Sequence, residues 1–186
     1  YLQFAPDVPS ASGGLSTYKI LYLEFWAQIT SLPSSGNMDL WHLVASATAR
    51  FFLKVASDGS VLLNVDGTQS AILPAGTIVA GTEYHFSLQV FMGSSGAANS
   101  KITLWLNDEL AGTVSGVSAL LSASASAVMR FGSSANVAGG ATVRYDGIYL
   151  SFSRRFGRAL KIKTLKPSGA GTSTVASFTV TGAVSK

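Results

Sequence analysis

Side chains able to carry out acid–base chemistry are few in this chain. There are three glutamates, Glu24, Glu83 and Glu109, and Asp108 directly precedes the last of them. Hydrolysis of a glycosidic bond needs two carboxylates that face the bond at a defined separation. No such pair is spaced along one expected strand, and Asp108 and Glu109 are neighbours in a turn whose side chains point apart. The pattern predicts no glycoside hydrolase site.

Other residues that could support catalysis or bind a metal are equally sparse. His42 and His85 are the only histidines, and neither has a second residue at metal-ligand spacing. The sequence contains no Gly-x-Ser-x-Gly motif and no glycine-rich phosphate loop between a strand and a helix. It has no cysteine, which excludes a disulfide framework and thiolate metal sites. We therefore expect a protein that is not an enzyme and holds no cofactor.

Two tryptophans on polar strand faces could serve as platforms for a sugar ring. Trp105 lies close to Asn107, and Trp26 lies between Glu24 and Gln28. Sugar sites combine an aromatic face with amide and carboxylate groups, so Trp26, Trp105 and Asn107 are candidate contacts for a glycan or a protein partner. The alternative is that both rings are covered by an arm of the chain or by a neighbouring subunit, and we favour this second interpretation.

The elements that would position these residues are strands. In Tyr18–Thr30 apolar side chains alternate with polar ones, and Thr82–Phe91 and Lys101–Asn107 repeat the pattern. A period of two indicates strands with one buried face. No long stretch has a helical period, and 47% hydrophobic residues can fill a sizeable core. The predicted fold class is all-β, a two-sheet antiparallel jelly-roll sandwich.

Further strands follow from the same alternation and from turn residues. Asp58-Gly59 is a hairpin signal for which we expect positive φ at both positions, and Asp66-Gly67 repeats it. Ser31–Met38 and Met92–Ser100 are predicted loops, whereas Ser115–Ala127 could be a loop or a short helix. The remaining expected strands are Tyr1–Ala5, Asp39–Ala47, Arg50–Ser57, Ser60–Val65, Leu110–Val114, Ala127–Gly132 and Thr142–Ser153.

Charge is scarce and unevenly distributed. Charged residues make up 12% of the chain, which fits either a surface covered by neighbouring protein or an ordinary secreted domain. Residues 1–143 hold five bases and eight acids, a net charge of −3, whereas residues 144–186 hold eight bases and one acid, a net of +7. A basic end suits docking onto acidic protein, and we prefer this to nucleic acid because no nucleic-acid-binding module is recognisable.

The composition changes after Phe156-Gly157, and this change divides the chain into two parts. Residues 1–157 are the predicted sandwich, and residues 158–186 are a basic C-terminal extension that reads as a docking arm, with a disordered tail as the alternative. Thr174–Val184 is extended in pattern and could add to a sheet edge. Apolar stretches are of strand length, so no membrane span is expected. The basic residues assigned to docking are Arg154, Arg155, Arg158, Lys161, Lys163 and Lys166.

Several short motifs resemble laminin-G-like, concanavalin A-like jelly rolls. The resemblance rests on Phe51–Val55, Asp58–Val61, Tyr84–Leu88 and Ile102–Leu110, and on Arg144–Leu150, which is similar to the closing strand of that family. This sequence departs from the pattern at Asp108, where the family usually has glycine. The resemblance implies a sandwich and raises calcium binding by loop carboxylates as an alternative to no metal. The aspartates at turns are Asp58, Asp66, Asp108 and Asp146.

A second resemblance is narrower. The segment Gly157–Gly171, which ends in Thr164-Leu165-Lys166-Pro167-Ser168-Gly169-Ala170-Gly171, is similar to a Thr-Leu-x-Pro-x-Gly-x-Gly segment that follows the closing strand in bacteriophage virion proteins. It implies a structural component of a phage tail, fibre, baseplate or head, located in the virion and bound to other virion proteins and to copies of itself. The alternatives are a carbohydrate-binding module that attaches to host-surface glycans and a secreted bacterial adhesin domain.

Overall fold

The protein is a sandwich of two antiparallel β-sheets. The computed structural model describes residues 2–4, 20–45, 48–65, 67–91, 100–117, 127–132, 141–151 and 155. All neighbouring strands within these ranges pair antiparallel. The predicted fold class is therefore confirmed. Nowhere in these ranges does a helix have the length and apolar character needed to cross a membrane.

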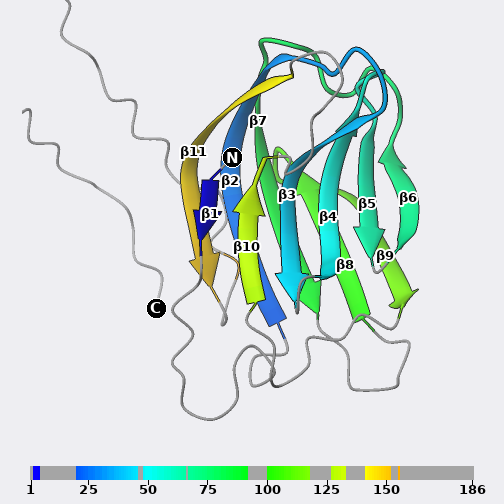
Figure 1. Ribbon diagram of the computed structural model, residues 1–186, viewed down its shortest axis with the longest axis vertical. Coiled ribbons are helices and arrows are strands. Elements are labelled where there is room, and N and C mark those ends of the chain that lie inside the picture. The colour runs from blue at the N-terminus through cyan, green and yellow to red at the C-terminus, as the bar shows by residue number, and fades with distance from the viewer. Residues whose placement is uncertain are drawn as a thin grey trace, which may run out of the picture.

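The two sheets lie face to face, with the six-stranded sheet in front of the five-stranded one in Figure 1. In the described part of the chain, the six-stranded sheet has the order β1 (Leu2–Phe4), β10 (Ala127–Phe131), β3 (Asn37–Ala45), β4 (Thr48–Ala56), β5 (Val61–Val65) and β6 (Thr68–Leu73). The five-stranded sheet has the order β11 (Thr142–Ser151), β2 (Ile20–Ser31), β7 (Glu83–Phe91), β8 (Ser100–Leu106) and β9 (Glu109–Val117).

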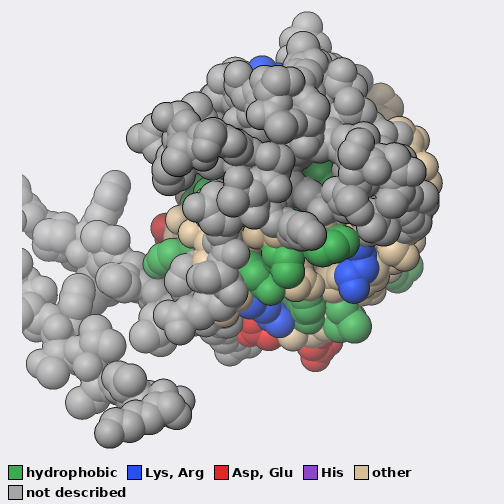
Figure 2. Space-filling model, turned by 90° about the horizontal axis from the view of Figure 1, so that it is seen from below, with side chains coloured by type: hydrophobic (Ala, Val, Ile, Leu, Met, Phe, Trp, Pro, Cys, Tyr) green, Lys and Arg blue, Asp and Glu red, His purple; other side chains and the backbone are tan. Residues whose placement is uncertain are grey.

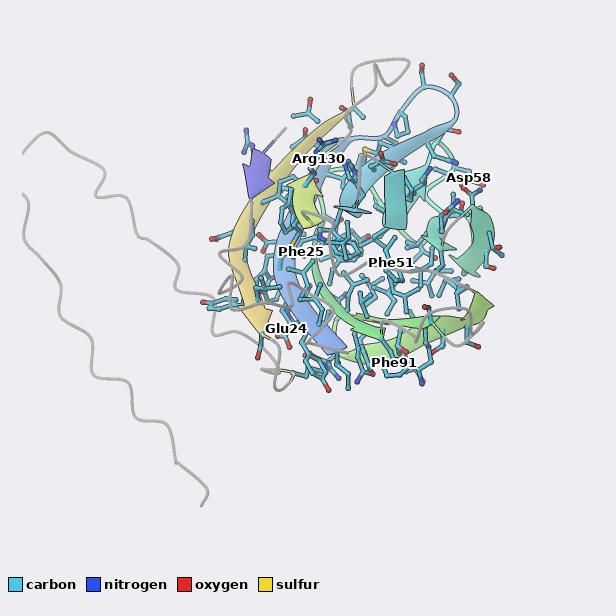
Figure 3. All side chains as sticks on the ribbon, turned by 60° about the horizontal axis from the view of Figure 1, so that its bottom comes forward. Glu24, Phe25, Phe51, Asp58, Phe91 and Arg130 are labelled. Carbon is cyan, nitrogen blue, oxygen red and sulfur yellow. The ribbon has the colours of Figure 1, made fainter. Side chains whose placement is uncertain are left out.

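Period-two alternation builds the core. On β2, the predicted inner row is completely buried, and the inner row of β7 is buried with it. Phe25 of β2 stacks on Phe86 at 5.3 Å between ring centroids and meets Phe131 of the opposite sheet edge-on at 5.4 Å. Phe25 and Phe51 lie between the sheets in Figure 3, whereas Glu24 lies on the outer side of β2. Residues of the inner rows are Leu21, Leu23, Phe25, Ala27 and Ile29 on β2 and Tyr84, Phe86, Leu88 and Val90 on β7.

One hydroxyl group links the two sheets through the core. Tyr145 of β11 donates a hydrogen bond from its hydroxyl to the backbone carbonyl of Leu40 on β3, at 2.8 Å. A buried hydroxyl needs such a partner. Burial also raises the pKa of the Tyr145 phenol, because the phenolate would lose its hydration. The edge strand of one sheet is thereby attached to the other sheet.

The connection from β6 to β7 is also tied to both sheets. Ile78 in the middle of this connection is buried in the core. Its N–H donates to the Gly59 carbonyl of the β4–β5 hairpin at 2.9 Å. Three residues later, the N–H of Gly81 donates to the Ile29 carbonyl on β2 at 2.7 Å. The loop therefore contacts each sheet through its backbone.

The hairpin expected at Asp58-Gly59 is present, but the predicted turn geometry is wrong. Only Gly59 has a positive φ, of 79°, whereas Asp58 does not. The Gly59 N–H donates to the Ala56 carbonyl at 3.0 Å, and Asp58 Oδ1 accepts from the Ser60 N–H at 2.9 Å. The loop is longer than two residues, so one left-handed position is enough to reverse the chain.

Some element boundaries differ from those expected. Strand β6 is not among the expected strands, and β2 and β3 each extend into the expected loop at Ser31–Met38. Strand β9 extends to Val117, which corrects the expectation of loop or helix from Ser115, and residues 118–126 lie outside the described residues. The predicted arm at 158–186 also lies outside them.

Candidate functional site

Buried polar side chains gather on the outer face of the five-stranded sheet. Glu24 on β2 and His85 and Ser87 on β7 occupy positions that alternate with core residues, yet none of the three is exposed. Charged residues are rarely buried completely unless they are paired. These side chains are therefore the first candidates for a functional site.

The imidazole of His85 lies between two carboxylates. Its Nε2 is 3.7 Å from Glu24 Oε2, and its Nδ1 is 3.4 Å from Asp108 Oδ1. Burial lowers the pKa of His85 because the imidazolium would lose its hydration, and this effect outweighs the opposing influence of Asp108 and Glu24. The neutral ring is thus favoured relative to an exposed histidine.

A tight turn brings Asp108 to this position. The β8–β9 hairpin turns at Asn107 and Asp108, which have φ values of 52° and 71°. Two successive left-handed residues are typical of a type I′ turn, and Asn and Asp tolerate this region better than other side chains. The Asn107 N–H donates to the His85 carbonyl at 2.8 Å, and the His85 N–H donates to Asn107 Oδ1 at 3.0 Å. Asn107, a predicted glycan contact, therefore fixes the turn against β7.

Arg155 completes the cluster. Its Nε donates to Ser87 Oγ at 3.0 Å and lies 3.9 Å from Glu24 Oε1, and its Nη2 donates to Asp108 Oδ1 at 3.4 Å. Its Cζ lies 4.4 Å from the ring centroid of Trp105, within the range of a cation–π contact. We expected Arg155 to belong to a docking arm, but its side chain binds the sandwich itself. The other predicted docking residues lie outside the described residues: Arg154, Arg158, Lys161, Lys163 and Lys166.

Both predicted tryptophan platforms border the same cluster. The Trp26 ring centroid lies 4.9 Å from that of His85, at an interplanar angle of 31°, and Trp105 carries the guanidinium of Arg155. Both tryptophans are partly buried. Gln28 is directed elsewhere, since its amide donates to the Gly81 carbonyl at 2.7 Å. The two platforms that the sequence suggested as alternatives are thus parts of one site.

This cluster could not be expected from the sequence, because it depends on how distant strands pair. The antiparallel pairing places Trp26 opposite His85, Glu24 opposite Ser87, and Ser87 opposite Trp105. The packing of the two sheets sets this register between strands that are distant in sequence. No local motif predicts it. The available signal was the occurrence of Glu24 and His85 on the polar faces of strands that otherwise carry little charge.

A smaller polar cluster lies on the six-stranded sheet. His42, which is buried, has its Nδ1 3.6 Å from Asp39 Oδ2, and Lys54 Nζ lies 3.7 Å from Asp39 Oδ1. The ring of Phe52 contacts both, at 5.5 Å from the His42 centroid and 4.5 Å from Lys54 Nζ. A bulge in the β3–β4 pairing between Asp39 and Trp41 accompanies this arrangement.

Two of the other turn aspartates, Asp58 and Asp146, make local contacts. Asp58 accepts from Ser60, and hydrogen bonds from Ser60 lower its pKa. Asp146 Oδ1 accepts from the Gly147 N–H at 2.7 Å. Asp66 lies outside the described residues, and within them no group of three or more His, Cys, Asp or Glu side chains is placed to hold a metal ion.

Comparison with known proteins defines the fold. No protein-family model matches the chain, and no curated protein sequence matches it. Solved structures do. An endo-β-1,4-glucuronan lyase from Trichoderma reesei matches with a TM-score of 0.53 at 10% identity, covering 71% of this chain and 68% of that one. The fold is concanavalin A-like.

Two further structures agree with this fold. A heptameric SAP-like pentraxin from Limulus polyphemus matches with a TM-score of 0.52 at 16% identity, over 72% of this chain and 64% of that one. A family 7 alginate lyase, A1-II′, matches with a TM-score of 0.51 at 15% identity, over 72% and 60%. The chain thus spans roughly two thirds of the length of these proteins or less. Lyases and a pentraxin share the fold, so the fold alone does not assign a function.

Proposed function

We propose that this chain is a non-enzymatic structural component of a bacteriophage virion, which acts by docking onto other virion proteins and further copies of itself. The similarity of Gly157–Gly171 to a segment of phage virion proteins supports the assignment to a particle. The C-terminal extension, residues 158–186, holds five bases and no acid, and this positive charge, against −3 in residues 1–143, supports its docking onto acidic protein surfaces.

One observation carries the non-enzymatic part of the proposal. The ionisable groups of the cluster contact one another: Arg155 reaches both carboxylates, and His85 lies between them. A catalytic acid or base needs a path to substrate, whereas Glu24 and His85 are completely buried and Arg155 covers Trp105. This arrangement suits a structural clamp at the start of the C-terminal extension.

The visible surface also fits a protein partner better than nucleic acid. Among the described side chains that are visible from below, hydrophobic, basic and acidic ones lie beside one another (Figure 2). Leu110 and Val79 are 64% and 55% exposed and add apolar area. A nucleic-acid interface would require clustered positive charge along one face.

Assembly in the presence of a shortened chain tests the proposal. Tagged full-length chain and a variant ending at Gly157 are each supplied during assembly of the source phage, and particles are purified and probed for the tag. A matched control keeps all residues but replaces Arg158, Lys161, Lys163 and Lys166 by glutamine. We expect the full chain in particles and both variants excluded. Equal incorporation of the shortened chain would refute the docking role of the extension, and absence of the full chain from every particle would refute the virion assignment.

Carbohydrate binding at the host surface is the second candidate. The convergence of Trp26, Trp105 and Asn107 on one site favours it, together with a fold shared with lyases that are named for glucuronan and alginate. A sugar ring that stacked on Trp105 would take the place of the Arg155 guanidinium. A glycan array probed with the full chain, Trp26→Ala and Trp105→Ala decides the matter. Binding that both substitutions abolish supports this function, whereas a silent array, or binding that neither substitution changes, rejects it.

A further inference from the structure

The groups around Arg155 match the shape of its guanidinium. A guanidinium is a planar cation with N–H donors along its edge and faces that stack on aromatic rings. Here the edge meets Ser87 Oγ at 3.0 Å and Asp108 Oδ1 at 3.4 Å, with Glu24 Oε1 at 3.9 Å from Nε. The indole of Trp105 lies 4.4 Å from Cζ. Acceptors at the edge and a ring against the face distinguish this site from one that fits a lysine ammonium.

The walls of the site belong to the sandwich and not to the segment that carries Arg155. Glu24 projects from β2, Ser87 from β7 and Trp105 from β8, three adjacent strands of one sheet. Asp108 is held by the turn that Asn107 ties to β7. These positions are fixed by strand pairing, so the site is formed in advance of its ligand.

Burial makes the site depend on a cation. Glu24 is completely buried, and an ionised carboxylate removed from water is costly unless an opposite charge lies close to it. With Asp108, the site presents two carboxylates. The guanidinium of Arg155 reaches both of them, at 3.9 Å from Glu24 Oε1 and 3.4 Å from Asp108 Oδ1.

We propose that the outer face of β2, β7 and β8 is a guanidinium-binding site, which the chain's own Arg155 occupies as an internal ligand. Arg155 follows the end of β11 at Ser151, and its side chain reaches across β2 and β7 to Trp105 on β8. Occupation of the site therefore anchors the start of the C-terminal extension to the sandwich. This binding site does not depend on the virion assignment.

Chemical rescue of the full chain tests the proposal. Arg155→Ala empties the site of its ligand, and methylguanidinium chloride is then titrated while thermal unfolding is followed by tryptophan fluorescence. Methylammonium chloride at equal concentration controls for charge and ionic strength. We expect the substitution to lower the unfolding midpoint and methylguanidinium to raise it saturably. At ten times its Kd, a ligand of the folded state increases the ratio of folded to unfolded protein about elevenfold.

Two comparison proteins show whether the stabilisation comes from binding at this site. The wild-type chain, whose site is filled, should gain no such stabilisation, and Arg155→Ala combined with Asp108→Asn should respond more weakly. An equal response to methylammonium, or an equal response of the wild-type chain, overturns the proposal. If Arg155→Ala does not fold, Arg155→Gln keeps part of the stem and takes its place.

Hydrogen exchange of the Arg155 Nε–H in the wild-type protein is a second test, which does not depend on the rescue experiment. The Nε–H of Arg155 is assigned in a nitrogen–proton NMR spectrum by its loss in Arg155→Lys. We expect its exchange with solvent to be slowed, because it donates to buried Ser87, and to be faster in Ser87→Ala. Exchange as fast as that of an exposed arginine would show that the site does not hold the group.

Discussion

Asn107 and His85 exchange two hydrogen bonds across neighbouring strands, from the Asn107 N–H to the His85 carbonyl and from the His85 N–H to the Asn107 side-chain oxygen. This pair attaches the tip of the β8–β9 hairpin to β7. The following residue, Asp108, is thereby held in a left-handed conformation with its carboxylate against the His85 ring. The turn residues Asn107 and Asp108 thus place a negative charge beside His85 on β7.

Removal of the Asp108 charge should destabilise the protein. Asp108→Asn keeps the shape and the tolerance for positive φ but loses the interaction with Arg155 and His85, so we expect a loss of about 1 kcal/mol, moderated by the partial exposure of the pair. Asp108→Gly should cost less, because glycine relieves the left-handed backbone. Urea unfolding measures both. Glu109→Gln, at the exposed next position, is the control, and an equal loss there would contradict the assignment.

Acid should weaken the fold through His85. Its pKa is lowered by burial below the ordinary value of 6.5, so the unfolded chain binds a proton at a pH where the folded chain does not. The contribution of His85 to the free energy of unfolding is fully present above about pH 6.5. It decreases as the pH falls from there toward the lowered pKa. Urea unfolding as a function of pH should show this decline in the wild type and a smaller one in His85→Gln. The effect is not due to His85 if His42→Gln flattens the profile and His85→Gln does not.

Gly59 should not tolerate a side chain. Its φ of 79° disfavours other residues, and a Cβ would press against the Ile78 carbonyl oxygen. We expect Gly59→Ala to lower the free energy of unfolding by about 2–4 kcal/mol, from backbone strain and steric overlap together. Gly36→Ala is a matched control, since Gly36 has a φ of 66° but open space around the added methyl. Similar losses in the two variants would mean that only the backbone matters.

The link between sheets at Tyr145 should be measurable. Tyr145→Phe leaves the Leu40 carbonyl without this donor in the core, and we expect a loss of about 1–2 kcal/mol. Because burial raises the Tyr145 pKa, alkaline absorbance titration of the folded protein should show this phenol ionising after exposed ones. Tyr149→Phe, at a position that is 40% exposed, should cost little. A normal titration of Tyr145 would argue against its burial.

Those parts of the fold that depend on local pattern could be predicted from the sequence. Every second residue of β2 and β7 is apolar and packs in the core, and the hairpin turns carry Asn-Asp and Asp-Gly. Strand β6 escaped prediction because it is an edge strand, largely exposed, and therefore lacks a buried row. The alternation of apolar and polar residues identifies a strand but does not indicate which strands pair with it.

The candidate site could be predicted only as separate parts. Trp26, Trp105 and Asn107 were found by residue type, but their meeting at His85 depends on the β2–β7–β8 register. Arg155 was assigned to a basic arm because its neighbours in sequence are basic. Its actual surroundings depend on the path of the chain after β11, which no spacing of residues encodes.

The backbone bonds of the β6–β7 connection to Gly59 in one layer and Ile29 in the other have a thermodynamic consequence. Unfolding of either sheet would expose Ile78 and free the β6–β7 connection from that sheet, which would weaken its hold on the other sheet. We therefore expect both sheets to unfold in one cooperative transition. Near-ultraviolet and far-ultraviolet dichroism should then give coincident midpoints.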